Sequence, residues 1–329
     1  MFGDVILPSA PKILYVRQDR IGDVFVSTPL VYALRQRYPE AQIDILVSRN
    51  NSAATFCLQS VVDQVHVLKK NSPQMLALLW KLRRTRYDLL IDLNHTASAT
   101  SNGIVRSVRA HHSIVLNNNV TTPAQHVVEQ GDRSQRHIID VLCDLLLPLG
   151  ISIEGNDKRP RLAIRQDIMC EVKNKAHATS SAPVLAVQIS GSSERRMYPA
   201  QALEHVIHAI RNRFPLVRII ILSAPADRAK AVHLAAVTGT LHLDPGPSYE
   251  HFAAAIASST WLLSPDTAAI HVASAYNIPS VVLFSRDPRG FLNWLPYDAP
   301  CWPIITEHDS LDSIPPDLVV ANLVSMMTC

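Results

Sequence analysis

The segment Gln18-Asp19-Arg20-Ile21-Gly22-Asp23 gathers charged side chains and a glycine directly after Lys12 to Arg17, an apolar run typical of a strand. Gly22 allows a ligand to approach the backbone closely, and Asp23 stands at the start of a predicted helix. A carboxylate at that place can cap the helix or act as a general base. The position alone leaves both roles open.

A second group of candidates follows the predicted strand Val184 to Ile189. Ser190, Gly191 and Ser192 can offer hydroxyl and backbone N–H groups to a phosphate. Arg196 adds a positive charge nearby, although its residue type alone favours an ordinary surface arginine. Together these residues predict a phosphate-binding loop.

A third group lies between the predicted strand Trp261 to Ser264 and the predicted helix Ala268 to Ala275. Asp266 and Thr267 precede that helix, whose free N–H groups suit a nucleotide diphosphate. His271 comes four residues after Thr267, so both can face one ligand, although a lone helical histidine is commonly structural.

Two further candidates, Asn94 and His95, come just beyond the predicted strand Leu89 to Leu93. They would lie where a ligand can reach the carboxyl end of the sheet. Arg20 and Gly22 are expected on the same side. The alternative for His95 is a loop histidine whose hydrogen bonds are satisfied locally.

The elements that would position these residues alternate between strand and helix. The expected strands are Lys12–Arg17, Gln42–Val47, Gln64–Leu68, Leu89–Leu93, Ser113–Leu116, Val184–Ile189, Val217–Leu222, Trp261–Ser264 and Ser280–Phe284. The expected helices are Asp23–Tyr38, His137–Leu149, Pro199–Arg213, Arg228–Thr238, Tyr249–Ser258 and Ala268–Ala275. This alternation predicts parallel sheets covered by helices.

The length of 329 residues favours two domains. Periodicity is lost around Gly150–Pro160 and again at His177–Pro183, so we expect domains of residues 1–165 and 166–329. The predicted fold class is α/β, with two Rossmann-like, doubly wound domains facing a central cleft where ligands bind at the carboxyl ends of the strands.

The composition excludes several classes of protein. A hydrophobic content of 47% with 18% charged residues is that of a globular chain, and a net charge of +3 gives no argument for nucleic acid. The five cysteines form no CxxC pair, which predicts neither a zinc site nor a disulfide framework and favours the cytoplasm. Met1 to Lys12 does not resemble a signal peptide, and no apolar run is long enough to span a bilayer.

Basic residues concentrate in the segment from His66 to Tyr87, which contains no acidic residue. The segment also carries the apolar run from Met75 to Trp80. Such an amphipathic basic helix fits an anionic membrane surface or an anionic substrate, and equally a solvated helix packed on its own domain. Any membrane contact is therefore expected to be peripheral.

Three segments resemble glycosyltransferase family 9, the ADP-heptose:lipopolysaccharide heptosyltransferases. They are KILYVRQDRIGDVFVSTPLVYALRQRYPEAQIDILVS, LAVQISGSSERRMYPAQAL and LLSPDTAAIHVASAYNIPSVVLFS. The resemblance extends over nearly the whole chain and implies the two-domain GT-B fold. It implies that the nucleotide sugar binds to the second domain and the acceptor to the first, on the side of Arg20, Gly22, Asn94 and His95. It also implies that Asp23 is the catalytic base, that Arg196 stands for the phosphate-binding lysine, and that Asp266 contacts donor-sugar hydroxyls while His271 contacts the phosphate side.

The chain departs from the family pattern where the donor would bind. Arg196 replaces lysine, Tyr198 replaces tryptophan before Pro199, and Ala268 replaces glycine in the Ser-Pro-Asp-Thr-Gly element. The run from Arg286 to Pro288 matches the loop after the last strand only approximately. An arginine keeps the positive charge but has a different geometry, and the Ala268 methyl group can narrow the approach of the pyrophosphate.

The resemblance implies an inverting heptosyltransferase that uses ADP-heptose and a lipopolysaccharide core or another saccharide acceptor, free or lipid-linked, in the cytoplasm or at the inner membrane. No cofactor is expected, and no metal, because an Asp-x-Asp pair is missing where an ion would bridge the diphosphate. Another sugar donor and a non-catalytic nucleotide-sugar-binding relative remain as alternatives. A nicotinamide-dependent oxidoreductase is disfavoured because the GxGxxG fingerprint is absent.

Overall fold

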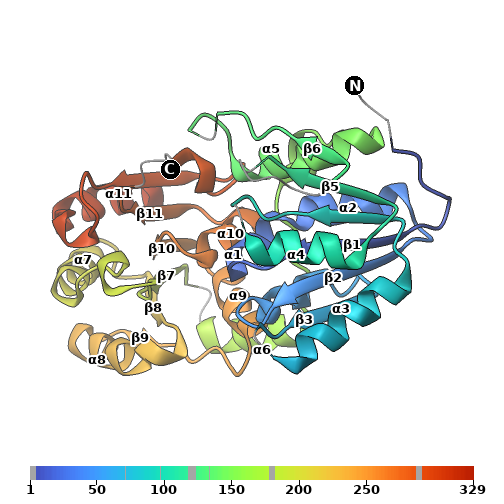
Figure 1. Ribbon diagram of the computed structural model, residues 1–329. Helices are drawn as coiled ribbons and strands as arrows, with labels where there is room; N and C mark the ends of the chain where they lie inside the picture. The colour runs from blue at the N-terminus through green and yellow to red at the C-terminus, as the bar shows by residue number, and fades with distance from the viewer. Residues whose placement is uncertain are drawn as a thin grey trace. The chain divides into compact units, whose positions relative to one another are not determined.

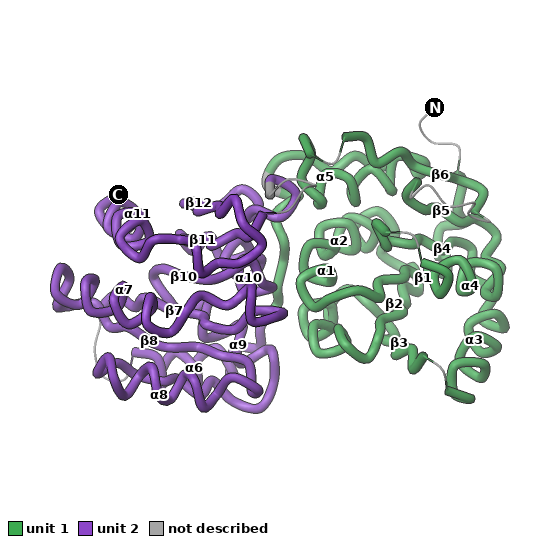
Figure 2. The backbone as a smooth tube through the Cα atoms, turned by 60° about the vertical axis from the view of Figure 1, so that its left-hand side comes forward, with its two compact units in different colours: residues 1–163 green, residues 164–329 purple. Residues whose placement is uncertain are grey.

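The computed structural model describes residues 5–70, 72–96, 98–117, 124–132, 134–177, 182–286 and 291–329 (Figure 1). The chain divides into two compact units, residues 1–163 and 164–329 (Figure 2). Each unit contains a six-stranded sheet in which every pair of neighbouring strands is parallel. Among the described residues, no helix is long and apolar enough to cross a membrane.

The sheet of unit 1 has the strand order β3-β2-β1-β4-β5-β6. Its strands are β1 (Lys12–Arg17), β2 (Gln42–Ser48), β3 (Gln64–Leu68), β4 (Leu89–Asp92), β5 (His112–Leu116) and β6 (His126–Val128). Its helices are α1 (Ile21–Val26), α2 (Thr28–Arg37), α3 (Pro73–Thr85), α4 (Ala99–Val108) and α5 (Ile138–Cys143), with 3-10 helices η1 (Ser52–Leu58), η2 (Asp144–Leu149) and η3 (Gly155–Lys158). The order reverses direction between β1 and β4.

Helices cover both faces of this sheet. Alternate residues of β1, Leu14 and Val16, pack with Leu82 of α3 and with apolar residues of α4, and form the core on one face. The intervening residues Ile13 and Tyr15 are also fully buried, so the opposite face is covered as well. Strands buried on both faces explain why the runs are continuously apolar.

The sheet of unit 2 has the order β12-β11-β10-β7-β8-β9. Its strands are β7 (Val184–Gln188), β8 (Arg218–Leu222), β9 (Leu241–His242), β10 (Trp261–Pro265), β11 (Ser280–Phe284) and β12 (Cys301–Ile305). Its helices are α6 (Gln166–His177), α7 (Ala200–Arg213), α8 (Arg228–Thr238), α9 (Tyr249–Ala257), α10 (Ala268–Ala275) and α11 (Pro316–Thr328), with 3-10 helices η4 (Glu194–Arg196), η5 (Pro225–Asp227), η6 (Phe291–Trp294) and η7 (Leu311–Ser313). The two sheets thus repeat one topology, and the second reverses between β7 and β10.

The core of unit 2 follows the same rule. Leu185, Val187 and Leu263 on one face of the sheet pack against apolar residues of α7, α8 and α11. On the other face, Val282 packs with Ile270 of α10. The α/β class with two Rossmann-like sheets is confirmed.

The helix expected from Asp23 to Tyr38 is wrong as a single element, because it is two helices that meet at Ser27. Pro29 has no N–H to donate to the carbonyl of Phe25, four residues earlier, and its ring would crowd that carbonyl. The Thr28 hydroxyl donates to the Phe25 carbonyl instead, at 2.7 Å. Pro29 therefore ends α1 and starts α2.

Candidate active site

The candidate residues lie at the carboxyl ends of the central strands, at the point in each sheet where the strand order reverses. In unit 1, β1 ends at Arg17 and β4 ends at Asp92. In unit 2, β7 ends at Gln188 and β10 ends at Pro265. Open parallel sheets bind ligands at this point, because the loops that leave the two central strands diverge there.

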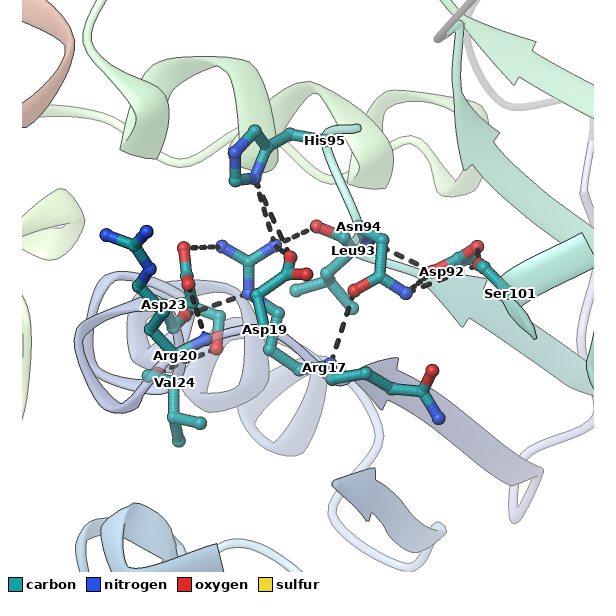
Figure 3. A network of polar contacts seen from close by, with 12 residues as sticks. Arg17, Asp19, Arg20, Asp23, Val24, Asp92, Leu93, Asn94, His95 and Ser101 are labelled. Atoms are coloured by element: carbon teal, nitrogen blue, oxygen red, sulfur yellow. Dashed lines mark hydrogen bonds and ion pairs between the residues drawn. The ribbon is translucent and has the colours of Figure 1, made fainter. Parts of the chain in front are cut away.

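Arg17 is the centre of the polar cluster in unit 1 (Figure 3). Its side chain is fully buried, and its Nη2 donates to Asp23 Oδ1 at 2.8 Å. The same guanidinium donates from Nε to the Asp23 backbone carbonyl at 3.0 Å and from Nη1 to the Leu93 carbonyl. A buried guanidinium needs such a set of acceptors, since burying an unpaired charge is costly.

Asp23 is held on two sides. While Oδ1 accepts from Arg17, Oδ2 accepts from the backbone N–H of Arg20 at 2.7 Å, which is one half of a capping box. The sequence predicts that the helix starts at Asp23, but it begins at Ile21, so Asp23 is its third residue. Each carboxylate oxygen retains a second lone pair, so capping and proton abstraction are compatible at this residue.

Asp19 and His95 lie on the other side of the same guanidinium (Figure 3). Arg17 Nη1 is 3.6 Å from Asp19 Oδ2 and 3.4 Å from His95 Nδ1. Burial raises the pKa of the Asp19 carboxyl above its usual range; the charge of Asp23 acts in the same direction and Arg17 opposes it.

The ligand atoms of Asp19, Asp23 and His95 lie within 4.8 Å of one another, a spacing that can hold a metal ion. The Arg17 guanidinium already contacts all three of these side chains. An ion would have to share this small space with a fixed positive charge, so the donor set does not fit a metal while Arg17 keeps this position.

A second buried network connects the ends of β1 and β4. Asp92 Oδ1 accepts from the side-chain amide of Asn94 at 2.7 Å, and Asp92 Oδ2 accepts from the Ser101 hydroxyl. Asn94 in turn accepts from the backbone N–H of Gln18 at 3.2 Å, which connects the two loops. Burial raises the pKa of the Asp92 carboxyl to about 6, against the effect of its hydrogen bonds with Ser101 and Asn94.

In unit 2, the loop after β7 folds back on itself at Gly191. A Cβ atom on Gly191 would lie 2.2 Å from the carbonyl oxygen of Arg196, so only glycine fits there. Ser190 is buried; its N–H donates to the Gln188 side chain at 2.5 Å, and its hydroxyl oxygen accepts from Ala224 N–H at 2.8 Å. The Ser190 N–H group expected to meet a phosphate is therefore engaged within the protein, whereas Ser192 is exposed.

Arg196 and Asp266 face each other across the two central strand ends of unit 2, with Arg196 Nη1 3.6 Å from Asp266 Oδ2. Both side chains are more than a quarter exposed, at 29% and 28%, so a ligand can reach them. Thr267 is the N-cap of α10, and its hydroxyl oxygen accepts from Ala269 N–H at 3.4 Å. Ala268 is therefore the first residue of α10, where the methyl group borders the free N–H groups.

His271 lies one turn into α10 and is only 4% exposed. Its ring centroid is 6.2 Å from that of Trp294. Tyr198 is also buried, and its hydroxyl donates to the carbonyl of Ile314 at 2.9 Å. Of the loop from Arg286 to Pro288, Asp287 and Pro288 lie outside the described residues.

The structure thus brings Arg20, Asp23, Asn94 and His95 into one cluster of unit 1, and Gly22 is a buried residue within α1. In unit 2 it brings Arg196 beside Asp266, with Thr267 next along the chain. Sequence reasoning missed the organising roles of Arg17, Asp92 and Ser101. A charged residue at the end of an otherwise apolar central strand was the available sign for Arg17.

The chain is similar to known proteins both in its sequence family and in its fold. The family model described as glycosyltransferase family 9 (heptosyltransferase) matches residues 75–302, about two thirds of the chain. The matched segment contains the whole cluster of unit 2 but not Asp23. None of the curated proteins compared with the chain by sequence matches it.

Solved structures show the same fold. The glycosyl transferase family 9 protein from Veillonella parvula superposes with a TM-score of 0.83 at 17% identity, over 98% of each chain. The E. coli ADP-heptose lps heptosyltransferase II gives 0.74 at 19% identity, over 96% of this chain and 98% of that one. E. coli heptosyltransferase WaaC, solved with ADP, also gives 0.74, at 16% identity and the same coverage.

The Asp92 network predicts a specific dependence of stability on pH. Folded Asp92 holds its proton up to about pH 6, whereas the unfolded chain releases it near pH 3.9. Asp92 therefore makes its full contribution to the free energy of unfolding below about pH 4. This contribution, up to about 3 kcal/mol, is lost as the pH rises through about 6. Asp92→Asn should remove this part of the decline in the free energy of unfolding.

Urea unfolding between about pH 4 and pH 7 measures the effect as the difference between wild type and variant. Asp309→Asn, at an exposed carboxylate, serves as the control and should leave the pH profile unchanged. Parallel pH profiles for wild type and Asp92→Asn would show that Asp92 is already ionised at pH 4.

Proposed function

The chain belongs to glycosyltransferase family 9, and we propose that it transfers a heptose from ADP-heptose to a lipopolysaccharide core or another saccharide acceptor, with inversion at the anomeric carbon. The observation that carries the proposal is the fixed, buried Asp23 carboxylate at the carboxyl edge of the unit 1 sheet, held by Arg17 and by the Arg20 N–H. It is supported by the Arg196 and Asp266 pair at the corresponding edge of unit 2.

In this proposal Asp23 accepts the proton of the acceptor hydroxyl while the hydroxyl oxygen attacks the anomeric carbon. The bond between that carbon and the diphosphate oxygen breaks, and the diphosphate leaves from the opposite side. Arg17 is a positioning residue, because its two hydrogen bonds to Asp23 keep the carboxylate in one orientation. A base fixed in advance needs no reorganisation at the moment of reaction.

The leaving diphosphate gains negative charge, which Arg196 would neutralise together with the N–H groups at the start of α10. Asp266, beside Arg196, would accept hydrogen bonds from hydroxyls of the donor sugar. The exposed Ser192 hydroxyl would add a contact to the phosphate, and the buried His271 would support the same end of the site.

We further propose that the reaction needs no metal ion. Arg196 and the α10 N-terminus supply the positive charge on the donor side, and on the acceptor side Arg17 occupies the centre of the Asp19, Asp23 and His95 group. The proposed location is the cytoplasm, at the inner membrane where a lipid-linked acceptor is found.

Of the two alternatives, one has specific structural support and the other has an observation against it. Ala268 at the first position of α10 and Arg196 in place of lysine favour a different nucleotide-sugar donor within the same fold. A relative that binds nucleotide sugars without turnover would retain the unit 2 cluster but would have no use for an Asp23 held in two places.

The proposed function is tested by incubating the purified protein with ADP-heptose, and with other nucleotide sugars, beside a lipopolysaccharide core acceptor. We expect release of ADP and a heptosylated acceptor, at a rate that EDTA does not change. Transfer from another donor alone would replace the proposed sugar. Binding of donors without any turnover would establish the non-catalytic alternative, and loss of activity with EDTA would refute the metal-independent step.

Asp23→Asn should lower kcat by about 10²- to 10⁴-fold, because the acceptor hydroxyl loses its base. Donor affinity, measured by calorimetry, should stay unchanged, because the donor is assigned to unit 2. Transfer at the wild-type rate in this variant would exclude Asp23 as the base. Unchanged donor binding also serves as the control for correct folding of unit 2.

Arg196→Ala should lower kcat/KM for the donor by about 10²- to 10³-fold, since the charge on the departing diphosphate is no longer met. Arg196→Lys should recover part of the loss, because it restores the charge but not the forked geometry. Arg195→Ala is the matched control, as the neighbouring arginine is exposed. Equal losses in the Arg195 and Arg196 variants would point to a general effect of surface charge.

A further inference from the structure

Helix α3 carries a solvent-facing surface that the proposed chemistry does not use. One set of its apolar residues packs on the core of unit 1: Met75, Leu78, Leu79 and Leu82. Leu76 and Trp80 do not belong to that set and are 69% and 61% exposed. The packed set holds the helix on the sheet, so the exposed Leu76 and Trp80 are not needed for packing within unit 1.

The exposed residues form one continuous stripe. Leu76, Trp80 and Arg84 follow one another at intervals of four residues, so they lie along one side of the helix. Lys81 and Arg83 flank this line and are exposed. We call the surface made by Leu76, Trp80, Lys81, Arg83 and Arg84 the α3 face.

The charge around the α3 face has one sign. From His66 to Tyr87 the chain has six basic residues and no acidic one: Lys69, Lys70, Lys81, Arg83, Arg84 and Arg86. Helix α4, which covers the same face of the sheet, adds exposed Arg106 and is followed by exposed Arg109. The nearest acidic side chains along the chain are half-buried Asp88, which accepts from Lys12 N–H at 2.8 Å, and exposed Asp63, which pairs with Arg35 at 2.7 Å.

We propose that the α3 face docks on an anionic lipid surface. A tryptophan beside a leucine, within a ring of arginine and lysine, is the composition that lies in the interfacial layer of a bilayer, with the rings among the head groups and the cations on the phosphates. The Arg84 guanidinium lies 4.5 Å from the centroid of the Trp80 ring. It shields the ring in water and can turn to a lipid phosphate at the membrane.

Other occupants fit less well. A second copy of the chain meeting the same face would bring like charges together without an acidic partner. A single-stranded nucleic acid gains from rows of exposed aromatic rings, and this face offers only Trp80. An anionic bilayer uses the aliphatic, aromatic and basic members of the face together.

The helix that carries the α3 face starts at the same edge of the unit 1 sheet as the candidate active site. Strand β3 ends at Leu68, at the sheet edge where β1 ends at Arg17, and Lys69 and Lys70 follow there. Helix α3 therefore starts at the edge of the unit 1 sheet where α1 also starts (Figure 1). The inference rests on the proposed function only in that a lipid-linked acceptor would be presented at this edge.

The test is flotation of the full chain with vesicles of phosphatidylcholine alone or mixed with phosphatidylglycerol. We expect binding only to the anionic vesicles. Leu76→Ser with Trp80→Ser should abolish it, and Lys81→Gln with Arg84→Gln should weaken it roughly 25-fold, at about fivefold per charge. Leu216→Ser, at a side chain 83% exposed in unit 2, and Lys173→Gln are the matched controls and should bind as wild type does.

Equal binding to both kinds of vesicle, no binding, or unchanged binding by the α3 variants would overturn the inference. Binding of an oligonucleotide or self-association that the α3 variants abolish, without vesicle binding, would assign the face to those occupants. Transfer to a water-soluble acceptor without lipid should be unchanged in the Leu76→Ser, Trp80→Ser variant. Vesicle binding is measured without donor, so the two proposals are tested separately. The protein can bind vesicles without transferring a sugar, and it can transfer a sugar without binding vesicles.

Discussion

The unit 1 cluster depends on one buried positive charge, the guanidinium of Arg17. Its burial is tolerated because five groups surround it: two carboxylates, two backbone carbonyls and the ring of His95. These partners come from the end of β1, the start of α1 and the loop after β4. The charge therefore fixes three segments relative to one another, and a change at any of them leaves part of a buried ion uncompensated.

The topology explains why this charge lies where it does. In a parallel sheet of this order, the loops after β1 and β4 leave in opposite directions, which opens a space at the ends of the two strands. The buried Asp92, Asn94 and Ser101 network lies at the end of β4, and Asn94 connects it to the loop after β1 through the Gln18 N–H. In unit 2 the loop after β7 is held locally, because the Gln188 side chain binds both the N–H and the carbonyl of Ser190.

Much of the fold follows from sequence pattern alone, because strands buried on both faces are continuous apolar runs. The expected bounds of β1, β3, β11, α8 and α10 agree with the structure. The pattern fails where local chemistry competes with periodicity, as at Pro29, where elements are very short, as with β6 and β9, and where a helix contains residues typical of turns, as α4 does at Asn102 and Gly103. The charged loop residues of the candidate sites could be predicted because they directly follow predicted strands. Their hydrogen-bond partners could not, because contacts such as Arg17 with Leu93 and Asn94 with Gln18 depend on the pairing of β1 with β4.

The departures from the family pattern in unit 2 have different structural weight. Tyr198 is buried and donates a hydrogen bond to the Ile314 carbonyl, which anchors the segment before α7. The absence of a side chain at Gly191 is demanded by the Arg196 carbonyl rather than by any ligand, which means that the backbone before the arginine is set by the chain itself. With its backbone fixed from both sides, Arg196 can vary its reach only through its side chain. The geometry of the proposed donor site is therefore most open to change at two groups, the Arg196 guanidinium and the Ala268 methyl group at the start of α10.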